Sequence, residues 1–159
     1  MRKLNNEELN RLNTAEYKQA EKKPVIIVLD DIRSLNNIGS IFRTADAFRI
    51  EGIYLCGITA CPPHREIHKS ALGATDSVDW KYFEDIAIAL SELKRNSYTI
   101  LAAEQIDQSI YLNNFLKEKK QKYALIFGNE VNGISTQALE FADVCIEIPQ
   151  QGTKHSLNV

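Results

Sequence analysis

The chain has 159 residues, of which 44% are hydrophobic and 25% are charged, and its net charge is −2 at pH 7. This balance suits one globular domain with its own core and excludes the strong overall basic charge of many nucleic-acid-binding domains. No apolar run approaches the ~18 residues that a membrane helix needs. The polar start MRKLNNEELN is unlike a signal peptide, so we expect a cytoplasmic protein with no membrane partner.

Cysteine and histidine are too sparse for a built metal site. Cys56, Cys61 and Cys145 are an odd set without CxxC spacing, which argues against a disulfide framework and a structural zinc site. His64 and His68 stand four positions apart, but no third ligand stands nearby. We therefore predict no bound metal.

The first half of the chain predicts a helix followed by strands and a second helix. Residues 1–23 are polar and are predicted to form an N-terminal helical extension that ends before Pro24. The apolar run VIIVLD at 25–30 is typical of a central strand in a parallel sheet. Helical spacing follows over 37–48, and GIYLC at 52–56 predicts another strand.

The second half continues the alternation of strands and helices. Further strands are expected at Tyr98–Ala103, Ala124–Phe127 and Val144–Ile148, with helices near 84–95 and 135–141. Such alternation is typical of an α/β fold with a parallel sheet flanked by helices. Without repeats or linkers, residues 24–159 are expected to form one domain behind the N-terminal extension.

The helix predicted over 37–48 carries an arginine on its polar side. Its apolar stripe comprises Ile38, Ile41, Phe42, Ala45 and Phe48. Arg43 falls roughly 140° from Ile38 and points away from the core. Asn37 is expected to cap the helix start. A solvent-facing arginine is the simpler interpretation, but Asn36, Asn37 and Arg43 gather near the carboxyl edge of a strand, where α/β sheets bind ligands.

The stretch YALIFGNEVNGIST at 123–136 nearly matches the phosphate-binding loop GxxxxGK[ST]. Ile134 stands where the lysine would be, and the Glu130 carboxylate would repel an anion. An ATPase is therefore a poor interpretation. The remaining prediction is a glycine-bounded turn that presents Asn129, Glu130 and Asn132 to a neutral or cationic ligand.

The last block is CIEIPQQGTKHSLNV at 145–159. A strand is expected to end at Pro149, and the polar side chains of Ser156 and Asn158 follow a turn at Gly152. A hydrolase built on Ser156 and His155 is not favoured, because adjacent side chains do not easily reach each other and no acidic partner is in register.

Taken in order, NNIGSIFRTADAF, IFGNEVNGIS and IEIPQQGTKHSLNV resemble the three motifs of the SpoU-type (TrmH-like) RNA 2′-O-ribose methyltransferases of the SPOUT superfamily. The resemblance covers residues 25–159. It implies a SPOUT-like parallel sheet with a C-terminal trefoil knot and S-adenosyl-L-methionine as the cofactor. It also implies RNA (tRNA or rRNA) as the partner, and a homodimer with the active site at the subunit interface. A sulfonium cofactor has no phosphate to neutralise, which fits the missing lysine.

The resemblance also implies site residues. The catalytic residues would be Arg43, Asn37, Glu130, Ser156 and Asn158, and the cofactor-binding residues would be Ala103, Gly128, Ile148 and Leu157. Glu130 would hold the knot loops or orient Arg43, and Arg43 would act either as a base or as a charged stabiliser. Family members usually continue past SLNV into a C-terminal helix, which we expect to be absent from this chain.

Two other functions use related folds. A catalytically inactive, dimeric RNA-binding module would share the fold but would not need Arg43, Glu130, Ser156 and Asn158. A flavodoxin-like or nucleotide-binding domain would need a glycine loop after the first strand, where this chain has LDDIRSLNN. The methyltransferase is therefore the leading hypothesis.

Overall fold

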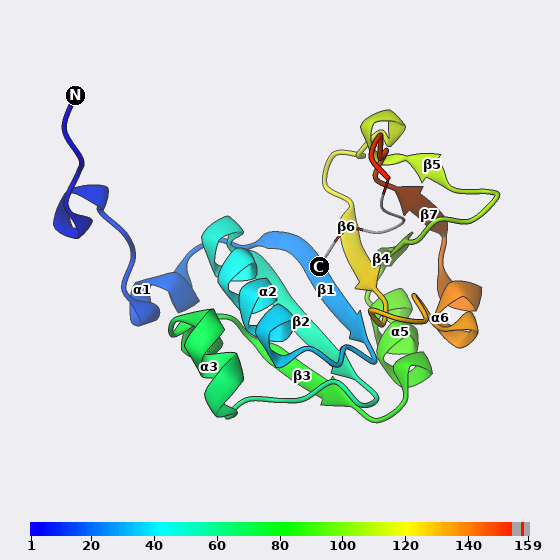
Figure 1. The fold of residues 1–159 in the computed structure, drawn as a ribbon, viewed down its shortest axis with the longest axis horizontal. Helices are drawn as coiled ribbons and strands as arrows, with labels where there is room; N and C mark the ends of the chain where they lie inside the picture. Colours follow the sequence, from blue (N-terminus) through cyan, green and yellow to red (C-terminus); the bar gives the residue numbers. More distant parts are fainter. Residues whose placement is uncertain (154–156, 158–159) are drawn as a thin grey trace.

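The structure is a computed structural model that describes residues 1–153 and 157 (Figure 1). The strands are β1 Lys23–Asp30, β2 Ile50–Cys56, β3 Trp80–Phe83, β4 Tyr98–Ala103, β5 Ile110–Tyr111, β6 Lys122–Phe127 and β7 Val144–Glu147. The α-helices are α1 Thr14–Gln19, α2 Leu35–Phe48, α3 Arg65–Ala71, α4 Ala74–Ser77, α5 Ile86–Arg95 and α6 Thr136–Phe141. Two 3-10 turns, η1 Asn6–Leu9 and η2 Leu112–Asn114, complete the elements of the described residues.

All seven strands form one parallel sheet in the order β3-β2-β1-β6-β4-β7-β5. The predicted α/β class with a parallel sheet and flanking helices is therefore confirmed. The two larger of three buried hydrophobic clusters among the described residues lie on opposite faces of the sheet. Helices α2 and α3 cover one face, and α5 and α6 cover the other (Figure 1). The short helix α4 joins the same core as α2 and α3 through Ala74.

Strand β1 shows why both faces are apolar. Successive side chains of a strand point to opposite faces. Val28 therefore enters the core under α5, and Leu29 enters the core under α2; both are fully buried. A continuous apolar run is what a strand covered on both faces requires.

The N-terminal extension is not the single helix that was predicted. Asn10 adopts a left-handed conformation with φ of 45°, which ends the turn η1. Asn13 then caps a new, short helix, and its side chain accepts a hydrogen bond from the Glu16 backbone N–H at 3.0 Å. The asparagines are good caps and turn formers, so they divide the polar stretch into two short pieces.

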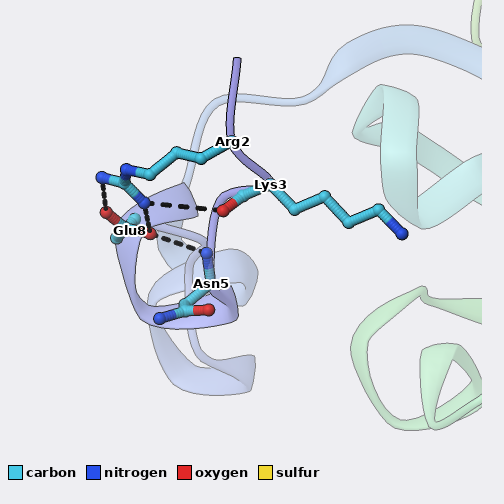
Figure 2. Close-up of polar contacts among 4 residues, drawn as sticks. All are labelled: Arg2, Lys3, Asn5 and Glu8. Atoms are coloured by element: carbon cyan, nitrogen blue, oxygen red, sulfur yellow. Dashed lines mark hydrogen bonds and ion pairs between the residues drawn. The ribbon is translucent and has the colours of Figure 1, made fainter.

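A small polar clip closes the turn η1 (Figure 2). The Glu8 carboxylate accepts hydrogen bonds from both terminal nitrogens of the Arg2 guanidinium, at 2.6 and 3.0 Å, and from the Asn5 backbone N–H at 2.7 Å. The Arg2 guanidinium, followed by the Asn5 N–H, lowers the pKa of the Glu8 carboxyl. Both side chains face water, so this clip adds little to the stability of the whole chain.

Two details of α2 also differ from the prediction. Ser34, not Asn37, caps the helix, because its hydroxyl accepts the Asn37 backbone N–H at 3.2 Å. Phe48 is 57% exposed and lies outside the buried stripe. It sits in the last turn of the helix, where the Lys23 ammonium lies 5.2 Å from the centre of its ring.

Candidate functional site

A pocket of about 420 Å³ opens at the carboxyl ends of three neighbouring strands, β6, β4 and β7. This is the edge where parallel α/β sheets bind ligands. Ala103, Gly128, Ile148 and Leu157, the four residues expected to bind a cofactor, all line it. They come from separate parts of the chain, and the strand order brings them together.

The lining of the pocket includes part of the loop after β6, which Asn129 organises. The Asn129 side chain is buried, and its Oδ1 accepts the backbone N–H groups of Val131 and Asn132 at 2.9 and 3.1 Å. Its Nδ2 donates to the Asp31 carbonyl at 2.7 Å, which ties the loop to the end of β1. The backbone of Asn129 also exchanges two hydrogen bonds with Gly133 at 2.9 Å.

Both glycines of this loop are required by its geometry. A Cβ at Gly128 would overlap the backbone of Gly133 and Ile134, where the loop folds back on itself. Gly133 has a φ of +70°, in the left-handed region that favours glycine. The two glycines that match the phosphate-loop pattern are therefore needed for close packing of the loop backbone against itself.

Two carboxylates hold the start of α6 against the sheet. Glu104 accepts the Ile134 backbone N–H at 2.8 Å, and Asp30 accepts the Ser135 backbone N–H at 2.7 Å. Burial raises the pKa of the Asp30 carboxyl, although its hydrogen bonds with Ser135 oppose the shift. Neither carboxylate was predicted from the sequence. The signal that could have identified them is the position of each acidic residue at the carboxyl end of a predicted strand.

Glu130 links the pocket loop to the start of α2. Its two carboxylate oxygens accept the backbone N–H groups of Arg33 and Ser34 at 3.1 and 3.0 Å, and the side-chain amide of Asn37 at 3.1 Å. Partial burial raises the pKa of this carboxyl. The hydrogen bonds from Arg33, Ser34 and Asn37 outweigh that effect, so the pKa of Glu130 is lowered overall.

Arg43 is exposed on the outer side of α2 and is not among the residues that line the pocket. Among the described residues Glu130 forms no hydrogen bond or ion pair with Arg43; it accepts hydrogen bonds from Arg33, Ser34 and Asn37 instead. Within one chain, the suggested orientation of Arg43 by Glu130 is therefore not seen. Ser156 and Asn158 lie outside the described residues.

The charge of the pocket restricts its ligand. Glu104, Glu130 and Glu147 line it, and among the described residues it contains no lysine or arginine. Apolar side chains from Phe127, Ile146, Ile148 and Leu157 complete the walls. Such a pocket repels a triphosphate and accepts a ligand with an apolar body and a positive charge.

Neither a candidate metal site nor a candidate membrane span is found within residues 1–153 and 157. No group of three or more His, Cys, Asp or Glu side chains there is arranged to hold a metal ion. No helix within the same residues is both long and apolar enough to cross a membrane.

Known proteins share both sequence and fold with this chain. A Staphylococcus aureus protein named as a TrmH family tRNA/rRNA methyltransferase is 28% identical over 143 residues, which cover 90% of this chain and 56% of that protein. The chain thus spans little more than half the length of this relative. The AdoMet-bound rRNA methyltransferase from Sinorhizobium meliloti aligns with a TM-score of 0.79 at 24% identity, covering 89% of this chain and 54% of that one.

The TrmH/SpoU tRNA modifying enzyme of A. aeolicus aligns equally well, with a TM-score of 0.79 at 23% identity over 92% of this chain and 74% of its own. At these identities the two structures establish a shared fold. The sequence model of the SpoU rRNA Methylase family matches residues 24–159, which is most of the chain. This protein therefore belongs to the SpoU rRNA Methylase family.

Proposed function

We propose that this chain carries the catalytic domain of an S-adenosylmethionine-dependent methyltransferase that acts on the ribose 2′-hydroxyl of tRNA or rRNA. Membership of the SpoU rRNA Methylase family supports the reaction class. The observation that carries the proposal is the pocket in which the four motif-derived residues Ala103, Gly128, Ile148 and Leu157 meet.

The pocket residues fit S-adenosylmethionine. When bound, this cofactor supplies an electrophilic methyl group on a positively charged sulfonium. Ile148 and Leu157 offer apolar surface to an adenosine body, and the carboxylates of Glu104 and Glu147 favour a cation. The turn that the Asn129 side chain holds brings Gly128 and Gly133 to the lining of the same pocket.

Arg43 is proposed to act as a fixed positive charge rather than as a base. Arginine side chains in general have a pKa of roughly 12.5–13.8, so a neutral guanidine at pH 7 costs on the order of 7 kcal/mol, at about 1.36 kcal/mol per pH unit. A charged guanidinium stabilises the oxyanion that develops as the 2′-hydroxyl loses its proton, and it also binds an adjacent phosphate. Ser156 and Asn158 are proposed to orient the ribose through their short polar side chains.

We further propose a homodimer and a C-terminal trefoil knot. Arg43 is exposed and lies outside the pocket of its own chain. A second copy that packs against α2 would bring Arg43 of the partner subunit to the pocket, and the active site would then be complete only in the dimer. The pocket loop and the end of β7 would be the segments joined by the knot.

Isothermal titration with S-adenosylmethionine tests this function first. We expect one binding event per subunit and no heat from ATP, because the described pocket residues carry carboxylates and no cation. Ile148→Arg places a cation in the pocket lining, and should weaken binding by about 100-fold, close to 3 kcal/mol. Failure of a folded dimer to bind S-adenosylmethionine would instead favour a catalytically inactive RNA-binding module.

A further inference from the structure

A second pocket, of about 520 Å³, lies away from the candidate cofactor site. It opens between the loop after β2, helices α3 and α4, and the first residue of β3, Trp80. The lining side chains that are charged, contain imidazole or are aromatic are those of His64, Arg65, His68, Asp76 and Trp80. This volume is in the range of pockets that bind small organic ligands.

The pocket has an aromatic wall. Trp80 is half-buried, because it packs partly against the core under α2, while its remaining surface lines the pocket. The imidazoles of His64 and His68 line the same space. Flat aromatic and imidazole surfaces are the platforms on which proteins stack unpaired nucleobases, at about 1–3 kcal/mol per base.

The second pocket contains one positively charged and one negatively charged side chain that suit different parts of a nucleotide. Arg65 supplies a guanidinium with the geometry that binds phosphate by paired hydrogen bonds. The Asp76 carboxylate only accepts hydrogen bonds, so it favours a base edge that carries N–H donors, as the edge of guanine does. His64 Nδ1 accepts the Glu66 backbone N–H at 3.2 Å, so its other nitrogen is the one left for a ligand.

The second pocket lies on the same side of the sheet as Arg43. Helix α3 packs directly on α2, where a Cβ at Gly39 would overlap the α3 backbone and the Ser70 hydroxyl. Arg43 stands on the exposed side of the same α2 helix. A nucleic-acid strand that contacts Arg43 would therefore lie on the same side of the sheet as the second pocket.

We propose that the second pocket binds one unpaired nucleotide of the RNA substrate, with its base against Trp80, its phosphate on Arg65, and guanine N–H groups facing Asp76. The inference rests on the proposed function for its choice of RNA. It concerns a site separate from the cofactor pocket, which can be assayed independently.

Fluorescence provides a direct test, because Trp80 is the only tryptophan in the chain. We would titrate the protein with a guanine-containing single-stranded RNA oligonucleotide and, separately, with guanosine 5′-monophosphate. Stacking of a base should quench the Trp80 emission. Arg65→Ala should weaken the RNA affinity about tenfold, whereas Arg95→Ala, which removes an exposed arginine on α5, should leave it unchanged.

Two comparisons decide the result. Replacing guanine by uracil in the oligonucleotide should weaken wild-type binding, and this preference should disappear in Asp76→Ala. Absence of quenching by RNA, or quenching that is unaffected by Arg65→Ala, would overturn the proposal. Quenching by the mononucleotide but not by RNA would also overturn it, in favour of a free-nucleotide site. Isothermal titration with S-adenosylmethionine on the same samples tests the proposed function separately. Cofactor binding without quenching of Trp80 would contradict only the second pocket.

Discussion

The Glu130 carboxylate joins two parts of the chain that are far apart in sequence. It accepts three hydrogen bonds from the segment before and within the first turn of α2, while its own backbone lies in the loop after β6. Hydrogen bonds to an ionised acceptor are stronger than neutral ones, and two of the donors are backbone N–H groups at a helix start. The residue therefore fixes the pocket loop relative to α2.

This arrangement predicts a pH dependence of stability. Because the folded-state pKa of Glu130 is lowered from 4.5, its contribution is present above that value and is lost as the pH falls through the folded-state pKa. Glu130→Gln should reduce the unfolding free energy near neutral pH by about 1 kcal/mol, a value discounted for solvent exposure. Urea unfolding at several pH values measures this.

A matched control makes the same Glu→Gln change at an exposed site, and so shows whether the effect depends on the position of Glu130. Glu140→Gln changes an exposed glutamate of α6 and should leave the stability unchanged at every pH. The difference between wild type and Glu130→Gln should shrink towards zero in acid. A constant difference across the whole pH range would contradict the proposed role of the charge.

Arg43 is predicted to affect turnover without affecting cofactor affinity. Arg43→Ala should lower kcat for RNA methylation by about 100-fold to 1000-fold, as loss of one oxyanion-stabilising group does. Arg43→Lys keeps the charge but loses the planar fork, so it should retain partial activity. Turnover assays combined with S-adenosylmethionine titration measure the two effects separately, and unchanged kcat in Arg43→Ala would remove this residue from the mechanism.

At the level of elements, the loop after β6 depends on close backbone packing at Gly128. Gly128→Ala places a methyl group against the backbone of Gly133 and Ile134, so the loop must shift. We expect a stability loss of about 1–3 kcal/mol and a large loss of S-adenosylmethionine binding. Gly152→Ala is the control, because a Cβ there has no neighbour within 4 Å among the described residues. Equal behaviour of the two variants would contradict the packing argument.

The central strands could be predicted from sequence because they are buried on both faces. The prediction of Tyr98–Ala103 matches β4 at both ends, and the run at 25–30 lies within β1. A short, β-branched apolar run is what a strand covered on both faces requires, since every side chain of such a strand is hidden from water. The helix α2 could be predicted for a related reason, because its one buried face gives the apolar residues a helical spacing.

The peripheral elements escaped prediction because little of their surface is buried. Strand β3 lies at the sheet edge and has no buried residue, and in α3 only Ile67 and Ala71 are buried. The start of α2 was misplaced because Ser34 and Asn37 are both good capping residues, and the choice depends on Glu130, which lies far along the chain. The cofactor-binding and catalytic assignments remain predictions, although four of those residues meet in one pocket.

At the level of the whole molecule, the proposed dimer predicts complementation between two inactive variants. Arg43→Ala keeps the pocket, and Ile148→Arg keeps the arginine. If each site combines one subunit's pocket with Arg43 of the partner subunit, a mixed dimer has one intact site. Equal mixing after subunit exchange should restore about a quarter of wild-type methyl transfer. Sites contained within one chain would give no recovery, and dimer exchange can be followed by mass measurement.

The sheet order also governs how the chain reaches its native state. Strand β1 lies beside β6, which pairs Val25 with Tyr123, about 100 positions later in the chain. Both edges of β1 are occupied only when the chain is available as far as β6, which ends at Phe127. Folding should therefore be slow, because such distant contacts require loop closure before they stabilise anything. During synthesis on the ribosome, one edge of the apolar strand β1 would stay unpaired until β6 emerges. Chaperone binding during this interval would protect that edge.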